Sequence, residues 1–350
     1  MHLLLVEPAY YTRYPPLGLL KLAALHKANG DTVELVRGCH SVSQVPDKVY
    51  ITSLFIYAWE PVHQAVEYYK KLFPGTRVVL GGIYATLMPA HAARSGADEI
   101  HSGLLEEAEN ILPDYSLVQG WQQSIAFSHR GCVNRCPYCA VPVMEKTEGP
   151  IRVKSIRHLV AAGHKKVILW DNNVLGATNW RDLIAELKEI GLPVDFNQGL
   201  DARRITEEVA QEFKGLHINP VRMAYDVPSE QKALATAIPA LAEAGFNRRR
   251  MLVYVLYNFQ DSPEDFLDKI RDLMDWGVVA YPMRFEPLDS LRKNQHIGPK
   301  WTAAQLEMVA CARRVIGYGG AFPPYEGLRN KLLKAKSFEE AFMLRPSHSP

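Results

Sequence analysis

The first third of the chain alternates short apolar runs with stretches in which apolar residues recur every three or four positions. Runs of this kind predict buried strands, and the periodic stretches predict helices with one apolar face. Strand and helix in alternation are typical of a parallel sheet with crossover helices. We therefore expect an α/β, Rossmann-like doubly wound domain over residues 1–112, with helices from Pro15 onward and over 61–73. Its strands are expected at 3–6, 32–36, 49–55, 77–80 and 99–101.

A second strand-then-helix rhythm covers residues 124–288, after a linker at 113–123 that contains turn-forming residues. Six repeats of this unit predict a partial (β/α)6 barrel of the TIM type. Residues 289–350 are expected to form a helical cap, with helices at 302–316 and 326–343 around a glycine-proline loop at 317–324. The barrel strands are expected at 125–128, 166–170, 194–197, 222–225, 251–256 and 278–284, and its helices at 154–162, 180–190, 207–213, 229–244 and 263–276.

Composition changes this picture little. A hydrophobic content of 47% and a charged content of 22% in 350 residues are those of a globular protein. The net charge of +2 neither demands nor forbids a nucleic-acid partner, so none is favoured. No apolar window reaches the length of a membrane span, and the apolar run at Met1–Val6 is shorter than the core of a signal peptide. We expect a cytoplasmic protein without a membrane partner, in which clustered thiols serve metals rather than disulfides.

Three of the five cysteines fall within eight residues, as Cys132, Cys136 and Cys139 in the pattern Cys-x3-Cys-x2-Cys. Three thiolates can hold three irons of a 4Fe-4S cluster and leave the fourth iron without a protein ligand. An open coordination position is what separates a reactive metal site from a structural one. The alternative is a structural zinc with a Cys3His ligand set, because His129 stands three residues before Cys132.

This motif, with Tyr138 directly before its last cysteine, resembles that of the radical S-adenosylmethionine (radical SAM) superfamily. The resemblance implies that Cys132, Cys136 and Cys139 ligate the cluster and that Tyr138 lies near the adenine of SAM. It also implies that the open iron binds the amino and carboxylate groups of SAM, and that reductive cleavage gives a 5'-deoxyadenosyl radical.

Polar residues follow several predicted barrel strands, where the active sites of barrels lie. The end of the second strand carries Asp171-Asn172-Asn173, and the third is followed by the polar run 197–203. We expect a site role for both rather than helix capping, whereas capping and a site role are equally favoured for Asp226 and Asp261. In the superfamily the second strand usually ends in Gly-Gly-Glu, which holds the SAM amino group. The resemblance therefore implies SAM contacts for Asp171 and Asn173 (amino group), for Asn197, Gln198 and Asp226 (ribose and carboxylate), and for Arg203 (carboxylate).

The first 112 residues resemble the cobalamin-binding domain that precedes the barrel in one radical SAM subgroup. The matching pieces are residues 15–20, the third predicted strand with the loop that follows it, and residues 79–85, which include the Gly81-Gly82 pair. That pair either lets a ligand approach the backbone or only forms a tight turn. The Asp-x-His-x-x-Gly motif is missing, since His40 lacks the aspartate and glycine. Cobalamin is a candidate cofactor, and a domain that kept the fold without the ligand is the alternative.

The sequence thus predicts a radical SAM enzyme that acts on an unidentified small molecule and takes electrons from a donor. The alternatives are a cobalamin-dependent radical SAM methyltransferase and a non-catalytic metal- or cobalamin-binding protein. Cys39 and Cys311 are expected to be structural. The basic run at residues 247–250 is expected to be a solvated turn.

Overall fold

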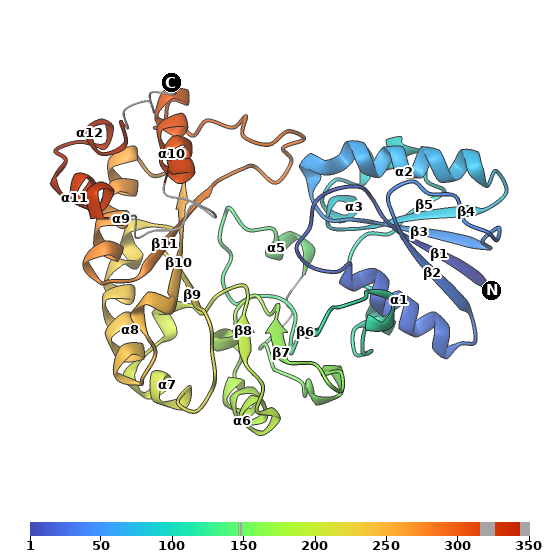
Figure 1. Ribbon diagram of the computed structural model, residues 1–350, viewed down its shortest axis with the longest axis horizontal. Helices are drawn as coiled ribbons and strands as arrows, with labels where there is room; N and C mark the ends of the chain where they lie inside the picture. Colours follow the sequence, from blue (N-terminus) through green and yellow to red (C-terminus); the bar gives the residue numbers. More distant parts are fainter. Residues whose placement is uncertain (146, 148, 316–325, 344–350) are drawn as a thin grey trace. The chain divides into compact units, whose positions relative to one another are not determined.

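The computed structural model describes residues 1–145, 147, 149–315 and 326–343 (Figure 1). The chain divides into two compact units. Unit 1 comprises Met1–Gly149, Ser155–Val167 and Pro287–Lys293, and unit 2 comprises Pro150–Lys154, Ile168–Glu286 and Asn294–Pro350.

Unit 1 contains a five-stranded parallel sheet in the order β2-β1-β3-β4-β5. This is the strand order of one common doubly wound fold, in which ligands bind beyond the carboxyl ends of the strands. The predicted parallel sheet with crossover helices is therefore confirmed. The strands are β1 (His2–Glu7), β2 (Thr32–Arg37), β3 (Lys48–Ser53), β4 (Arg77–Gly82) and β5 (Glu99–Ile100).

Alternate side chains of β1 serve two different cores. Leu4 and Val6 pack in the cluster that includes helix α2 (Trp59–Leu72), while Leu5 packs with Leu19 and Ala23 of helix α1 (Leu17–Ala28). The two helices cover opposite faces of the sheet (Figure 1). Successive side chains of a strand point to opposite faces of the sheet, and both faces are covered here. Every position of β1 therefore favours an apolar residue, which explains its continuous apolar run.

Two strand ends differ from the sequence prediction. The strand expected to reach residue 55 ends at Ser53, because the chain turns there into a 3-10 turn (Ile56–Ala58) that leads into α2. β4 continues through Gly82, and the short helices α3 (Ile83–Leu87) and α4 (Pro89–Ala92) follow it. These short helices were not predicted.

The remaining strands form two three-stranded sheets, β6-β7-β8 and β11-β10-β9. In the first sheet Lys165 N donates to Gln122 O, before β7 and β6, and Asn197 N donates to Leu169 O at the ends of β8 and β7. In each pair the hydrogen bond joins the same ends of the two strands, as in a parallel sheet. One parallel bridge, Val194 to Ile218, joins β8 to the segment before β9. The strands are β6 (Gln123–Ala126), β7 (Lys166–Leu169), β8 (Val194–Phe196), β9 (Val221–Ala224), β10 (Met251–Tyr257) and β11 (Val279–Arg284).

Helices follow most of these strands, as predicted, with one exception. The helix expected at 154–162 is wrong, since only a 3-10 turn (Arg157–Leu159) forms there. The Ser124 hydroxyl accepts a hydrogen bond from Ala161 N at 2.9 Å, which takes the amide that a continuing helix would use. The helices observed are α6 (Trp180–Ile190), α7 (Glu207–Glu212), α8 (Gln231–Glu243) and α9 (Pro263–Asp275).

The described part of the tail contains three helices, α10 (Ala303–Val315), α11 (Glu326–Lys334) and α12 (Phe338–Phe342). The single helix predicted at 326–343 is wrong, because Ser337 caps a new helix by accepting from Glu340 N at 3.2 Å. The predicted loop at 317–324 lies outside the described residues. Among the described residues, no helix combines the length and apolar character that a membrane crossing needs.

The close packing of β3 and β4 leaves no room for a side chain at Gly82. Its φ is +100°, and a Cβ built there would lie 2.3 Å from Ser53 O. Gly82→Ala should lower the stability of the protein by about 2 kcal/mol or more, because it adds a backbone clash to a left-handed conformation. Thermal and urea unfolding measure this loss. Gly75→Ala is the control, since a Cβ there meets nothing within 4 Å, and equal effects of the two changes would contradict the account.

Candidate functional site

The cysteine loop follows β6 in unit 1. Cys132, Cys136 and Cys139 form no disulfide and are half-buried. Cys139 N donates to Cys136 O at 3.1 Å, and Asn134 N donates to the sulfur of Cys132 at 3.4 Å. In the described part of the chain, no three His, Cys, Asp or Glu side chains are close enough together to hold a metal. The loop therefore carries three soft donors that a metal would have to draw together.

Arg130 anchors the start of this loop. Its Nε and Nη2 donate to the two carboxylate oxygens of Glu109 at 2.7 and 2.9 Å, and its Nη1 donates to Glu145 Oε1 at 3.0 Å. The guanidinium also lies over the Phe127 ring, 3.4 Å from its centroid. The other oxygen of Glu145 accepts from Gly131 N at 2.8 Å. One cation thus joins segments before and after the three cysteines.

Lys21 of α1 completes the anchor. Its Nζ donates to Glu109 O at 3.0 Å and lies 3.5 Å from Glu109 Oε1. Burial alone would raise the pKa of Glu109, but the hydrogen bonds and charge of Arg130, with Lys21, lower it below its ordinary value. Burial lowers the pKa of Lys21. Glu109 is therefore held as a carboxylate between two cations.

Gly131 fits where no other residue would. Its φ is +81°, and a Cβ there would lie 2.0 Å from Thr147 Oγ1. The left-handed backbone lets the chain turn directly from the Arg130 anchor into the cysteines.

His129 is buried, and its Nδ1 lies 3.1 Å from the hydroxyl of Ser128. Together with the three cysteines it forms no gathered ligand set among the residues that the structure describes. Neither the zinc hypothesis nor the iron-sulfur hypothesis is thus favoured by a preassembled site.

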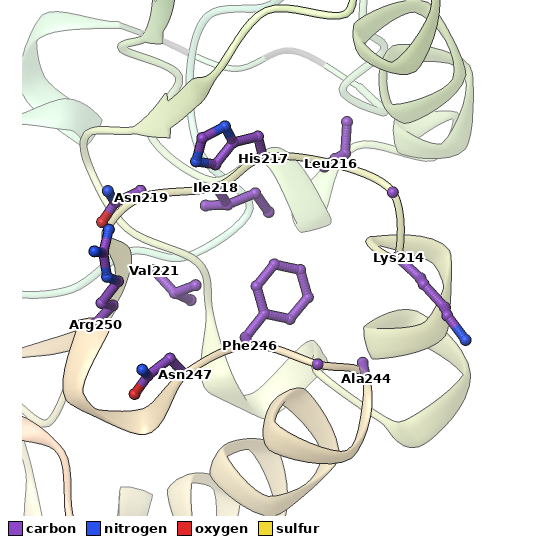
Figure 2. Close-up of a pocket in the computed structure, with 12 residues that line it drawn as sticks. Lys214, Leu216, His217, Ile218, Asn219, Val221, Ala244, Phe246, Asn247 and Arg250 are labelled. Carbon is purple, nitrogen blue, oxygen red and sulfur yellow. The ribbon is translucent and has the colours of Figure 1, made fainter.

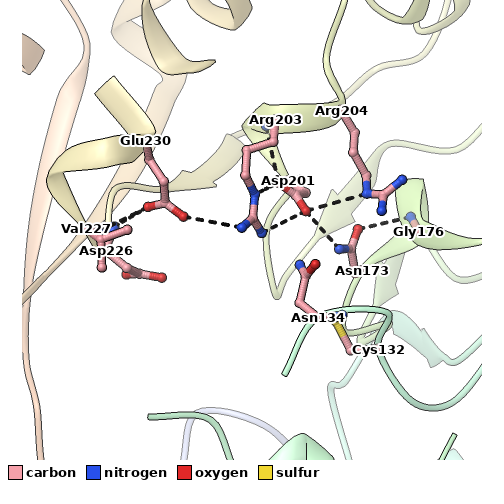
Figure 3. Close-up of polar contacts among 10 residues, drawn as sticks. All are labelled: Cys132, Asn134, Asn173, Gly176, Asp201, Arg203, Arg204, Asp226, Val227 and Glu230. Atoms are coloured by element: carbon pink, nitrogen blue, oxygen red, sulfur yellow. Dashed lines mark hydrogen bonds and ion pairs between the residues drawn. The ribbon is translucent and has the colours of Figure 1, made fainter. Parts of the chain in front are cut away.

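A polar network lies at the carboxyl ends of β7, β8 and β9 in unit 2 (Figure 3). At its centre Asp201 accepts from Arg203 Nε at 2.7 Å, from Arg203 Nη2 at 3.0 Å and from Asn173 Nδ2 at 3.1 Å. Arg204 Nε lies 3.7 Å from the same carboxylate. The network therefore brings together two of the predicted site residues, Asn173 and Arg203, through an aspartate.

Glu230 extends this network to the end of β9. Its Oε1 lies 3.9 Å from Arg203 Nη1, and its Oε2 accepts from Asp226 N at 2.7 Å and from Val227 N at 3.2 Å. The side chain of Arg203 is 47% exposed, so its guanidinium is accessible although carboxylates lie on two of its sides. Chemically, the network offers both a cation and amide groups to a charged ligand.

Capping occurs at one position in each of the two predicted polar runs. The amide oxygen of Asn173 accepts from Gly176 N at 3.1 Å and caps a 3-10 turn (Val174–Gly176), and Asp201 caps another (Ala202–Arg204) by accepting from Arg203 N at 3.2 Å. Asp261 is not the cap of α9, because Ser262 caps that helix. Asn173 thus combines a capping role with its contact to Asp201.

The other predicted site residues differ in their burial. Asp171 is buried at the end of β7, and Tyr138 is half-buried in the cysteine loop. Gln198 is exposed, and its Nε2 donates to Asn197 Oδ1 at 3.4 Å. The SAM contacts expected of these residues stay predictions.

Sequence reasoning missed two buried ion pairs. Arg222 donates to both carboxylate oxygens of Asp195, at 2.7 and 3.1 Å, and to the hydroxyl of Tyr254 at 2.7 Å. Lys269, 1% exposed, donates to Leu256 O at 2.6 Å and to Asp261 Oδ2 at 3.3 Å. A charged residue within an apolar strand or helix face indicates a buried ion pair, but the neighbouring sequence does not identify the residue that pairs with it.

A second missed group lies after β4 in unit 1. The hydroxyl of buried Tyr84 lies 2.8 Å from His63 Nε2 and 2.5 Å from His91 Nδ1, and the ring of Trp59 packs edge-on against both imidazoles. Burial raises the pKa of Tyr84 to about 12. It also lowers the pKa of His63 and of His91, helped by the neighbouring imidazole and by Arg94 respectively. One phenol is thus shared by two imidazoles that favour the neutral form.

No protein-family model matches this sequence, and a comparison with functionally characterised proteins gives no significant match.

Arg130→Gln tests whether the anchor orders the cysteine loop. Losing the guanidinium leaves Glu145 without this cation and Glu109 with Lys21 alone, so we expect a loss of about 2–3 kcal/mol. Alkylation of Cys132, Cys136 and Cys139 in the metal-free protein should become about tenfold faster, the factor that 1.4 kcal/mol of local stability gives. Mass spectrometry of labelled peptides measures the rates.

Arg135→Gln is the matched control, because Arg135 lies in the same loop and is exposed. Equal labelling rates in the two variants would show that Arg130 does not order the loop.

The histidine pair predicts a dependence on pH. The pKa of both histidines is lower in the folded protein than in the unfolded chain, so the unfolded chain takes up protons first as the pH falls. The contribution of the two neutral histidines to the free energy of unfolding is therefore full above pH 6.5 and is lost as the pH falls through their folded pKa. The melting temperature of the wild type should therefore fall more between pH 7.5 and 5 than that of a His63→Gln/His91→Gln variant. His158→Gln, at an exposed position, should follow the wild type, and parallel curves for all three proteins would refute the account.

Proposed function

We propose that this protein is a radical SAM enzyme, in which the cysteine loop of unit 1 holds a 4Fe-4S cluster. The observation that carries the proposal is the loop itself. It offers three half-buried thiols that form no disulfide, spaced Cys-x3-Cys-x2-Cys in the loop that follows β6, and its first turn is fixed by Arg130. A surface loop without a ligand would not need a half-buried cation between two glutamates at its start.

The donor set fits this cofactor. Three thiolates suit iron-sulfur clusters and leave one iron open. The N–H of Asn134 points at the sulfur of Cys132, as hydrogen bonds that tune cluster potentials do. When bound, the reduced cluster supplies the electron that cleaves SAM to methionine and a 5'-deoxyadenosyl radical, which takes hydrogen from the substrate.

The residues of unit 2 are assigned to SAM recognition. In this proposal Arg203 pairs the SAM carboxylate, and Asn173 with Asp171 accepts from its amino group. Asn197, Gln198 and Asp226 contact the ribose or carboxylate, and Tyr138 of the cysteine loop contacts the adenine. Arg203 supports this assignment best, because its exposed guanidinium already binds a carboxylate, that of Asp201, in a two-point geometry.

The proposed fold of this region is an open barrel of the TIM type. Its support is the order of the strands, since the two three-stranded sheets follow the chain order and a bridge joins Val194 to Ile218. The chemistry expected on such a scaffold lies beyond the carboxyl ends of the strands. The substrate is a small molecule, and a separate donor supplies the electron in the cytoplasm.

A cobalamin-dependent methyltransferase is the alternative, and only the doubly wound sheet of unit 1 supports it. The space beside Gly82 is filled by the backbone of Ser53, so this glycine serves packing within the sheet rather than the approach of a ligand. A non-catalytic metal-binding protein is the third candidate. The experiment below distinguishes all three.

Anaerobic reconstitution with iron and sulfide should give about four irons per chain, the content of one cluster. The reduced protein should then convert SAM to 5'-deoxyadenosine. Cys136→Ala should abolish this conversion, since two thiolates no longer hold the cluster. Cys39→Ala, at an exposed cysteine of the same unit, should keep wild-type iron content and activity.

Three results would count against the proposal. Zinc without iron after reconstitution would favour the structural metal site. S-adenosylhomocysteine together with a corrinoid absorption band would favour the methyltransferase. Equal activity of Cys136→Ala and Cys39→Ala would remove the cysteine loop from the chemistry.

A further inference from the structure

A groove of about 300 Å³ lies in unit 2 at the amino ends of β9 and β10 (Figure 2). Its walls are two loops, residues 214–221 before β9 and residues 244–250 before β10. The candidate SAM-binding network lies at the opposite, carboxyl ends of the neighbouring strands β8 and β9. The groove is therefore separate from the proposed chemistry within the same unit.

Three apolar side chains form the floor of the groove. Ile218 and Val221 are 6% and 1% exposed, and the ring of Phe246 is half-buried. Figure 2 shows all three side chains directed into the space between the two loops. An apolar floor beside one aromatic ring suits a flat, apolar ligand body.

The rim is polar and positive. Arg250 and Asn219 lie on the same side of the groove, while Lys214 points away from it (Figure 2). Within the described part of the chain, the side chains of Arg250, Asn219 and His217 make no hydrogen bond or ion pair. The residues described as lining the groove include Lys214 and Arg250 and no aspartate or glutamate. The guanidinium is thus uncompensated within the groove.

Neighbouring arginines show that this position is distinct. The run 247–250 forms the expected turn, since Asn247 caps a 3-10 turn (Arg248–Arg250) by accepting from Arg249 N at 2.9 Å. Arg248 Nη1 donates to Trp276 O at 2.9 Å, which gives it a structural role. Arg250 alone of the three lines the groove.

We infer that this groove binds a small organic oxyanion, a carboxylate or phosphate monoester carried on a flat apolar body. Arg250 binds the oxyanion through two N–H groups, Asn219 donates its amide to the same group, and Phe246 with Ile218 and Val221 holds the body. The volume lies at the lower end of the range for small-molecule sites, so the ligand is about the size of a substituted ring.

Phenyl phosphate is the probe, with inorganic phosphate as the comparison, and isothermal titration of the purified full-length protein gives both affinities. Phenyl phosphate should bind at least tenfold more tightly than inorganic phosphate. Arg250→Gln should weaken phenyl phosphate at least tenfold, and Phe246→Ala should remove the preference over inorganic phosphate. Arg249→Gln is the matched control on the same exposed turn and should bind as the wild type does.

Several outcomes would overturn the inference. These are equal affinities for the two phosphates, equal losses in Arg249→Gln and Arg250→Gln, and no saturation at about 10 mM ligand, a concentration above the Kd of even weak specific binding. Tighter binding of a single-stranded oligonucleotide that weakens in all three arginine variants (positions 248, 249 and 250) would assign the face to nucleic acid instead. Because Arg250 is exposed, its variant should keep the wild-type melting temperature, which separates lost binding from lost folding.

Discussion

The buried pair of Arg222 and Asp195 is the contact on which unit 2 most depends. β8 and β9 belong to different sheets, and the parallel bridge from Val194 of β8 reaches Ile218 in the segment before β9 rather than β9 itself. Arg222 supplies two hydrogen bonds to Asp195 on β8 and one to Tyr254 on β10. Burying two such ions is unfavourable unless each is paired. Any shift of β8 along β9 would break the pairing, and the pair therefore fixes the register on which the strand-end residues depend.

The cysteine loop uses the same chemistry for a different purpose. Arg130 also holds carboxylates, but it does so at the start of a loop, and its side chain keeps 24% exposure. Its pairing with Glu109 and Glu145 fixes the two flanks and leaves the thiols between them unconstrained by any disulfide. A loop held at its ends can rearrange its centre at little cost. This is what a site needs when its ligands gather only around a metal.

Local pattern predicted the elements well where one face decides the structure. The bounds of α6 (Trp180–Ile190) agree with the prediction, and both cores around β1 follow from the period of two. The pattern failed where a distant side chain takes a backbone group, as Ser124 does with the amide of Ala161. It also could not identify Lys269, whose acceptors at Asp226, Leu256 and Asp261 are brought together only by the fold. The cysteine motif could be identified from the sequence because its residues are close together in the chain. The groove beside Arg250 could not be predicted, because two separate loops form it.

The two ends of the strands in unit 2 differ in the charged groups that would surround a bound anion. At the carboxyl ends Arg203 already binds Asp201 and faces Glu230, so a ligand carboxylate must compete with an internal one. At the amino ends Arg250 has no such competitor among the residues described around it. A ligand anion that takes the place of Asp201 on Arg203 also takes an acceptor from Asn173 Nδ2, which couples such binding to the position of Asn173. A ligand anion at the amino ends need not displace a carboxylate, since none lines the groove among the described residues. The first arrangement suits a site that must change when its ligand arrives, and the second suits simple, reversible occupation.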